Sequence, residues 1–186
     1  MSDPDRTLRV KIAGEPFEFE QIHALNHRTF AEEIPRYAAV PTRRLVDRFD
    51  ADNTYVIALR GERLVGMVAI RAKRPFSLDE RLPDLDRHLP RGRSICELRL
   101  LAVERSERRG RLLPRLLDAV WRHAVARGHD VAIISGIVQQ QKLYTHLGFE
   151  PFGPLIGTPE AQFQPMMLTI ERFAPRAPSL FKHVES

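Results

Sequence analysis

Ser94-Ile-Cys-Glu-Leu-Arg-Leu-Leu-Ala-Val103 is an apolar run that carries one acid and one arginine, and it predicts a buried strand. Glu104-Arg-Ser-Glu-Arg-Arg-Gly-Arg111 follows as a loop that is dense in cations. From Leu112 to Val125, apolar residues then recur at the spacing of a helix with one buried face. A basic turn between a buried strand and the start of a helix is a place where phosphate binds.

The segments downstream continue the alternation of strands and helices. Gly128 closes the long helix, and Asp130-Val-Ala-Ile-Ile-Ser135 predicts a second buried strand. Residues 139–147 predict a short helix, which Gly148 stops. Residues 162–170 predict a final strand.

Upstream, Thr7 to Ala13 alternates as a strand does. A helix with apolar positions from Phe19 to Phe30 is expected to end before Pro35. Pro41 to Phe49 predicts a second, short helix. The strands 53–60 and 64–71, joined by a turn with a glycine, predict a hairpin.

Two prolines bear on further expectations. Pro75 introduces an extra helix, with Ser77 and Glu80 as its capping box and a stripe of four leucines: Leu78, Leu82, Leu85 and Leu89. Pro165 favours an edge or a bulge for the last strand. We expect a single domain over residues 1–173 and a C-terminal tail over 174–186. The order of elements predicts an α/β (α+β) mixed sheet with helices on both faces.

Composition narrows the class of protein. The 186 residues carry 29 Lys and Arg against 24 Asp and Glu, a formal charge of +5, and 43% are hydrophobic. These values are typical of an ordinary globular protein, and the net charge alone favours a basic surface over an anionic ligand. The local cluster of Arg108, Arg109, Arg111 and Arg115 is the better evidence for an anionic ligand. No apolar run reaches the length of a membrane span, and Met1 to Asp5 has no signal-peptide character. The lone Cys96 excludes an internal disulfide, and a cytoplasmic location is expected.

Other ligands find little support in the sequence. His23 and His27 have a spacing that can chelate a metal, but no third ligand is near them, so packed or solvated histidines are favoured and no metal is expected. The basic charge is not interleaved with aromatic residues, so nucleic-acid binding ranks well behind.

Residues 55–149 resemble the GNAT acyltransferase superfamily. The signature Leu-Tyr-x-x-x-Gly-Phe stands here as Leu143-Tyr144-Thr145-His146-Leu147-Gly148-Phe149, and Glu97 to Val103 is similar to the family's fourth strand. The resemblance implies a mostly antiparallel sheet in which two central parallel strands splay apart. It also implies an N-acyltransferase that uses acetyl-CoA or another acyl-CoA as co-substrate and a small-molecule amine as acceptor.

The phosphate turn departs from the family pattern. The usual Arg/Gln-x-x-Gly-x-Gly/Ala falls on Arg109-Gly-Arg-Leu112-Leu-Pro114, so the arginine is kept and both later small residues are replaced. Leucine lacks the backbone freedom of glycine and crowds an approaching pyrophosphate, whereas proline donates no amide. Nearby cations can compensate by pairing with phosphate directly. The expected donor-binding residues are Leu101, Ala102, Val103, Arg108, Arg109, Gly110, Arg111, Leu112, Leu113 and Arg115.

The resemblance also implies catalytic roles. A pantetheine arm would add to the exposed edge at residues 101–103 as an extra strand. Glu97 is the candidate general base for the amine, and Tyr144 is the candidate general acid for the departing thiolate. Strand alternation places Glu97, Arg99 and Leu101 on one face, where Arg99 neutralises the acid or orients an acidic acceptor. The alternative for Glu97 and Arg99 is a structural ion pair, and for Tyr144 a core tyrosine.

A second resemblance joins the chain to the autoinducer synthases and N-acyl amino acid synthases. These share the GNAT-like fold, take longer acyl chains, often from acyl carrier protein, and lack the glycine-rich turn. The resemblance implies that five residues shape the acceptor and acyl pocket: Arg28, Phe30, Glu33, Asp47 and Asp50.

Three hypotheses therefore remain from the sequence. An N-acetyltransferase of a small amine ranks first, and an acyl-carrier-protein-dependent N-acyl amino acid synthase ranks second. The third is a catalytically silent module that binds acyl-CoA or a protein partner. The acceptor is not specified by the sequence, and a homodimer is left open because edge strands in such folds often pair.

Overall fold

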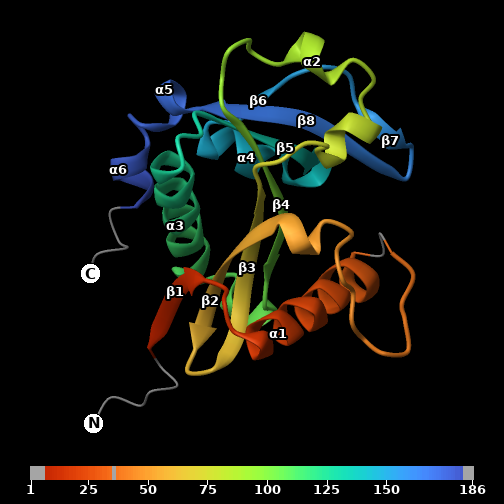
Figure 1. Ribbon diagram of the computed structural model, residues 1–186, viewed down its shortest axis with the longest axis vertical. Coiled ribbons are helices and arrows are strands. Elements are labelled where there is room, and N and C mark those ends of the chain that lie inside the picture. Colours follow the sequence, from red (N-terminus) through yellow and green to blue (C-terminus); the bar gives the residue numbers. More distant parts are fainter. Residues whose placement is uncertain (1–6, 35–36, 182–186) are drawn as a thin grey trace. The chain divides into compact units, whose positions relative to one another are not determined.

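The computed structural model describes residues 7–34 and 37–181 (Figure 1). The chain divides into two compact units. The first unit comprises Met1–Ile70 and Leu100–Val120, and the second comprises Arg71–Arg99 and Trp121–Ser186. The single domain expected over residues 1–173 stays a prediction, and each unit is described by itself.

The described residues form a mixed sheet that is mostly antiparallel, as predicted. Its strands are β1 (Leu8–Ile12), β2 (Asn53–Arg60), β3 (Arg63–Arg71), β4 (Ile95–Val103), β5 (Val131–Ile137), β6 (Glu150–Pro151), β7 (Ile156–Thr158) and β8 (Ala161–Thr169). Their hydrogen-bonded order is β1-β2-β3-β4-β5-β8-β6, with β7 also paired to β8. The pair β4–β5 is parallel, which gives the mixed sheet expected of a GNAT-like fold.

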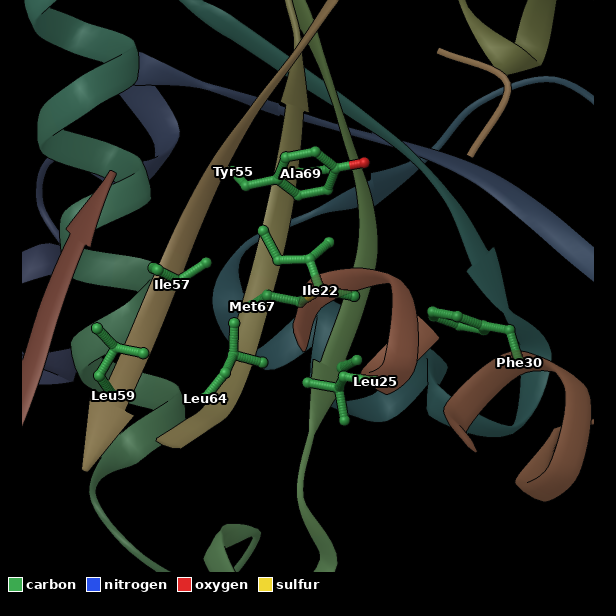
Figure 2. Close-up of a cluster of buried hydrophobic side chains, with 10 residues drawn as sticks. Ile22, Leu25, Phe30, Tyr55, Ile57, Leu59, Leu64, Met67 and Ala69 are labelled. Atoms are coloured by element: carbon green, nitrogen blue, oxygen red, sulfur yellow. The ribbon is translucent and has the colours of Figure 1, made fainter. Parts of the chain in front are cut away.

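The first unit is built from β1, the β2–β3 hairpin and a helix that packs on it. The helix α1 (Pro16–His27) continues as the π-helix η2 (Arg28–Glu33), so the helix expected from Phe19 to Phe30 is confirmed. Its apolar residues meet those of β2 and β3 in one buried cluster (Figure 2). The cluster contains Ile22, Leu25, Phe30, Tyr55, Ile57, Leu59, Leu64, Met67, Ala69 and Ala102, with Leu100 packed against it. The long helix α3 (Leu112–Ala126) begins in this unit.

Residues 41–49 do not form the short helix that the sequence predicts. They form a turn and an irregular segment, and only the short 3-10 helix η3 (Asp50–Asp52) follows. The segment is held to α1 because the backbone N–H of Leu45 donates to the carbonyl of His23 at 3.0 Å. The carboxylate of Asp47 accepts a hydrogen bond from the N–H of Phe49 at 3.0 Å. This side-chain hydrogen bond takes the place of a backbone hydrogen bond of a helix.

In the second unit, β8 pairs with β5 along seven residues, from Val131↔Thr169 to Ile137↔Phe163. The two strands run side by side in Figure 1. The edge position predicted for this strand is wrong, because β6 and β7 pair with its other side. Pro165 lies between the stretch that pairs with β6 and the stretch that pairs with β7, where only its carbonyl is used. That carbonyl accepts from the N–H of Phe152 at 2.9 Å.

The insertion after Pro75 forms two short helical pieces rather than one helix: η4 (Ser77–Glu80) and α2 (Leu85–His88). The predicted capping box is also wrong, because the carboxylate of Asp79 accepts from the N–H of Phe76 at 2.6 Å. The predicted leucine stripe is nevertheless buried as a group. Leu78, Leu82, Leu85 and Leu89 pack with Val131, Ile133, Phe152 and Ile156 in one apolar cluster.

Four further helices lie in the second unit. They are η6 (Val138–Gln140), α4 (Gln141–Leu147), α5 (Ile170–Phe173) and α6 (Ala177–Leu180). The last two occupy the stretch expected to be a tail, and Ala177, Leu180 and Phe181 pack against a cluster around Phe149 and Phe173. Residues 182–186 of that tail lie outside the described residues. No helix in the described ranges combines the length and the apolar character that a membrane crossing requires.

Candidate functional site

The predicted donor strand carries a local distortion. Leu100 of β4 has a left-handed backbone, with φ +53°, a conformation that costs a leucine about 1–2 kcal/mol. Leu100 and Ala102 both belong with the core around α1. Strict alternation need not continue through such a residue, so the expectation that Glu97, Arg99 and Leu101 share one face stays a prediction.

The opening of the sheet at β4 stays a prediction. The parallel register joins Ile95–Glu97 to Val131–Ile133, within the second unit. The predicted donor contacts at Leu101, Ala102 and Val103 belong to the first unit. There, the chain leaves the sheet beside β3, where the N–H of Glu104 donates to the carbonyl of Val65 at 2.9 Å.

The basic turn after β4 is organised by ion pairs of the first unit. The turn contains the 3-10 helix η5 (Arg105–Glu107). Arg108 donates through Nε to the carbonyl of Val103 at 2.9 Å and through Nη2 to the carboxylate of Glu33 at 2.6 Å. Arg105 lies 3.4 Å from the same carboxylate. Burial alone would raise the pKa of Glu33, but Arg108 and Arg105 hold that pKa below its usual value.

The predicted phosphate-binding cations therefore divide into two pairs. Arg108 is engaged as described, and Arg115 donates to the carbonyl of Leu8 at 3.3 Å. Arg109 and Arg111 are exposed and form no hydrogen bond or ion pair with a described residue. Phosphate contact by this second pair stays a prediction. Gly110 is also exposed, and its N–H donates to the carbonyl of Glu107 at 3.2 Å.

Leu112, which replaces a glycine of the family pattern, is a core residue. Its side chain is 1% exposed and packs over Gly66 of β3. A Cβ at Gly66 would lie 2.7 Å from Cδ2 of Leu112 and 3.0 Å from Cδ1 of Leu116. The sequence led us to expect that this leucine crowds an approaching pyrophosphate. That expectation is wrong, because the side chain is buried in the core. Leu113 is half-buried.

Glu97 is almost fully buried in the second unit, with 1% of its surface exposed. Its carboxylate accepts from the N–H and hydroxyl of Ser77, at 2.8 and 2.5 Å, and from the N–H of Leu78 at 3.2 Å. Nε of Arg99 lies 3.5 Å from the same carboxylate. These contacts favour the ion-pair alternative, because Glu97 anchors both the start of η4 and the Arg99 guanidinium.

Tyr144 lies on α4, in the second unit, with its ring packed over Gly136 of β5. A Cβ at Gly136 would lie 2.9 Å from Cδ2 of Tyr144. The ring also stands edge-on to Phe149, with 6.4 Å between centroids, in an apolar cluster that includes Leu98 and Trp121. The helix ends at Gly148, whose φ is +101°. The ring therefore has a structural role, and the acid role of its hydroxyl stays a prediction.

The residues implied by the second resemblance fall into two groups of the first unit. Arg28 pairs with Glu104 at 2.5 Å, and Glu33 pairs with Arg108 as described above. Phe30 is a core residue with 4% of its surface exposed. These two ion pairs thus join the basic turn after β4 to η2.

The second group is a network that the sequence does not reveal. The hydroxyl of Tyr55 donates to Asp50 at 2.7 Å, and Nε2 of His23 lies 3.1 Å from the other oxygen of that carboxylate. The amide of Asn53 donates to Asp47 at 3.1 Å and to the Tyr55 hydroxyl at 3.3 Å. Burial raises the pKa of Tyr55, and the neighbouring Asp50 raises it further.

The histidines that were considered as metal ligands are packed instead. His23 belongs to this network, and Nε2 of His27 accepts from the N–H of Val40 at 3.1 Å. Across the described ranges, no group of three or more His, Cys, Asp or Glu side chains is arranged to hold a metal ion. Tyr55 was missed because it sits in an apolar strand, where an aromatic residue indicates only packing.

The sheet order, with its parallel β4–β5 pair, and the α4 motif are those of a GNAT-like fold. The family model described as N-acyl amino acid synthase FeeM matches residues 21–171, and the chain belongs to this family. A comparison with curated proteins finds no match. The second resemblance is thereby confirmed, and it falls within the GNAT superfamily named first.

Solved structures share the fold at low identity. A CoA-dependent acyl-homoserine lactone synthase, BjaI, solved with SAM and isopentyl-CoA, has a TM-score of 0.78 at 23% identity, covering 96% of this chain and 89% of that chain. FeeM, an N-acyl amino acid synthase from uncultured soil microbes, has a TM-score of 0.71 at 18% identity, covering 91% and 94%. A putative N-acetyltransferase from Lactobacillus plantarum has a TM-score of 0.65 at 16% identity, covering 89% and 99%. The family membership makes the chain an acyl-transfer synthase, and the acetyl-transferring subtype is not confirmed.

Proposed function

We propose that the chain is an N-acyl amino acid synthase. It transfers an acyl group from a phosphopantetheine thioester, carried by CoA or by acyl carrier protein, to the amine of an amino acid. The observation that carries the proposal is the family match over residues 21–171. It reverses the order of the hypotheses from the sequence, in which acetyl transfer to a small amine ranked first.

The protein must bind the donor, orient the acceptor and supply a proton to the leaving thiolate. The amine nitrogen, as the neutral base, attacks the thioester carbonyl carbon, the C–S bond breaks, and the amide and a free thiol form. The donor must be held with its thioester accessible, the acceptor must be oriented, and the departing thiolate must gain a proton because a free thiol has a pKa of about 8.5. The proton that the amine loses balances the one that the thiolate gains.

For the donor, we assign phosphate pairing to Arg109 and Arg111. Both guanidinium groups are exposed in the turn before α3, and neither is engaged by a described acid. Pantetheine pairing falls to the backbone of residues 101–103. Arg108 positions this edge, because it binds the carbonyl of Val103 and Glu33 together.

For the acceptor, the second unit offers Arg99, which is 10% exposed at its side chain and fixed by Glu97. A buried guanidinium of this kind suits the carboxylate of an amino acid, because it binds carboxylates in a planar, directional way. Glu97 then acts mainly as a positioning residue for Arg99 and for the start of η4. Its role as general base for the amine is the weaker assignment, since three donors already occupy its oxygens.

Tyr144 remains the proposed proton donor to the thiolate. The test is thiol release together with mass detection of the N-acyl product, using amino acids against acetyl-CoA, long-chain acyl-CoA and acylated carrier protein. We expect turnover with a longer acyl donor, and Tyr144→Phe is expected to lower kcat about 100-fold without weakening donor binding. Tyr37→Phe is the matched control, because Tyr37 is 42% exposed and lies outside the proposed machinery.

The alternatives are separated by the same measurements. Turnover restricted to acetyl-CoA would favour the N-acetyltransferase. Donor-induced thermal stabilisation without turnover on any acceptor would favour the silent module, because a ligand that binds the native state stabilises it by mass action. Turnover that Tyr144→Phe leaves intact would remove Tyr144 from the mechanism while the synthase function stands.

A further inference from the structure

Two polar side chains on the core-facing side of α1 and η2 have no hydrogen-bond partner among the described residues. Asn26 is 1% exposed, and both its amide nitrogen and its amide oxygen are unsatisfied. Thr29 is 4% exposed, and its hydroxyl is unsatisfied. The two residues, named here the polar pair, lie three apart in the sequence at the junction of α1 and η2.

The pair sits in an apolar setting. Asn26 follows Ile22 by four residues and precedes Phe30 by four, so it lies on the same side of the helix as these two core residues. Figure 2 shows both of them in the cluster that α1 forms with β2 and β3. A buried amide without hydrogen-bond partners destabilises the fold. Such groups are rare in native proteins, so each one calls for a physical explanation.

Two features of the same unit point to a ligand there. The cluster that contains Ile22 and Phe30 also includes Ala102 of β4, with Leu100 packed against it, and Leu100 has a left-handed backbone with φ +53°. The helix itself changes from α to π at Arg28, between the two polar residues, and π-turns occur frequently at functional sites. Strain and unsatisfied polar groups thus coincide beside the strand that is proposed to carry the donor.

We propose that Asn26 and Thr29 bind the acceptor's amine. This inference rests on the proposed function. Oδ1 of Asn26 and Oγ1 of Thr29 are two acceptors for the two N–H bonds of a neutral primary amine. Engaging both N–H bonds leaves the nitrogen lone pair directed away from the protein and toward the thioester carbon. Nδ2 of Asn26 remains a donor for a carbonyl or carboxylate oxygen of the same acceptor.

The pair also defines an acceptor class. Both groups are uncharged, so they favour the neutral amine over the ammonium and a primary amine over a secondary one. A secondary amine such as proline offers only one N–H and leaves one of the two buried acceptors unpaired. Primary α-amino acids are therefore expected to be acylated and N-alkylated amino acids to be rejected.

The test is a set of three variants assayed for acceptor and donor kinetics and for thermal stability. Asn26→Leu keeps the number and branching of the side-chain heavy atoms and removes the polar ones, and Thr29→Val does the same for the hydroxyl. We expect each variant to lower kcat/KM for the acceptor about tenfold or more, to leave the KM of the donor unchanged, and to keep or raise Tm. Leu25→Met is the control, because this neighbouring core residue has no polar role and should leave the kinetics unchanged.

Opposite results would overturn the inference. Acceptor kcat/KM within twofold of wild type in both variants would show that a buried water or packing accounts for the pair. An equal loss for donor and acceptor would remove the acceptor assignment. If Asn26→Leu does not fold, the kinetics of Thr29→Val alone test the inference. Equal acylation of proline and alanine by the wild type would contradict the proposal that both N–H bonds of the amine are bound. Absence of wild-type turnover on every donor would instead defeat the proposed function.

Discussion

Two helices each pack a large side chain over a glycine of a neighbouring strand. They differ in how closely their sequences follow the family motifs. In the first unit, Leu112 of α3 fills the space left by Gly66 of β3. In the second unit, Tyr144 of α4 fills the space left by Gly136 of β5. The α3 turn has lost the glycine expected at position 112, whereas the α4 motif is intact.

The difference shows that motif residues are judged correctly only with their packing partners. A leucine in place of a glycine looks like a damaged phosphate turn until a strand glycine is seen to receive it. An intact Leu-Tyr-x-x-x-Gly-Phe motif looks catalytic, yet its tyrosine ring is also a packing element. The first three of the four predictions below separate packing from ligand binding in these two regions.

The largest effect is expected at the first glycine. Leu112→Ala should lower the free energy of unfolding by about 2–5 kcal/mol, since the side chain is buried and leaves a cavity. Gly66→Ala should lower it by about 1–3 kcal/mol, because the added methyl meets Leu112 and Leu116. The double variant Gly66→Ala/Leu112→Ala should cost less than the sum, because the methyl occupies the new cavity. Additive losses in urea unfolding would mean that the two sites are not coupled.

The second glycine should show a smaller loss of stability with a loss of activity. Gly136→Ala places a Cβ 2.9 Å from the Tyr144 ring and 3.3 Å from the carbonyl of Gln164, so we expect a loss of about 1–3 kcal/mol. Displacement of the ring should lower kcat as well. Gly14→Ala is the control, because a Cβ there meets nothing within 4 Å. Unchanged kcat in a destabilised Gly136→Ala would show that the ring's position does not matter to the reaction.

The cations of the turn should separate binding from stability. Arg109→Ala/Arg111→Ala is expected to weaken acyl-CoA binding by about 1.5 kcal/mol, roughly tenfold, and to leave unfolding unchanged. Arg108→Ala should instead lower stability by about 1 kcal/mol, because it loses its bonds to Val103 and Glu33.

Acyl-pantetheine, which lacks the nucleotide phosphates, is the control ligand for this comparison. Its affinity should be the same for wild type and for Arg109→Ala/Arg111→Ala. An equal loss for both ligands would place the two arginines away from the phosphates.

Much of the fold was predictable from local patterns. The β2–β3 hairpin, β4, α3 and α4 were predicted within a few residues, because their apolar spacing and terminal glycines are determined locally. The segment 41–49 was mispredicted because the side chain of Asp47 and the carbonyl of His23 supply bonds that a helix would otherwise make. Pro165 was misplaced because the break between β6 and β7 depends on residues distant in sequence.

The candidate site was predictable as a set of residues and not as a set of contacts. The basic turn stands out in composition, but which of its arginines are already paired depends on Glu33, some 70 residues earlier. Glu97 was identified as a buried acid on the expected strand, whereas its bonds to Ser77 come from an insertion that no motif describes. The orphaned amide of Asn26 has no signature in the sequence at all, because only burial distinguishes it.

The smallest expected effect concerns acid pH, and it differs between the two units. The pKa of Glu107 is lowered mainly by its two bonds from Arg60, and the pKa of Glu18 is lowered by Lys11 and two backbone amides in spite of burial. Carboxylates with a lowered folded-state pKa stabilise the fold above about pH 4.5 and lose that contribution as the pH falls further. In the second unit, Glu171 also has a lowered pKa through Arg93, but its side chain is 64% exposed and water screens the pair. Amide exchange corrected for intrinsic rates should therefore show the first unit opening before the second between about pH 4.5 and 3. Glu107→Gln should flatten this pH dependence in the first unit. Equal opening of both units in acid would show that the Glu107–Arg60 and Glu18–Lys11 pairs contribute no more to stability than the exposed Glu171–Arg93 pair.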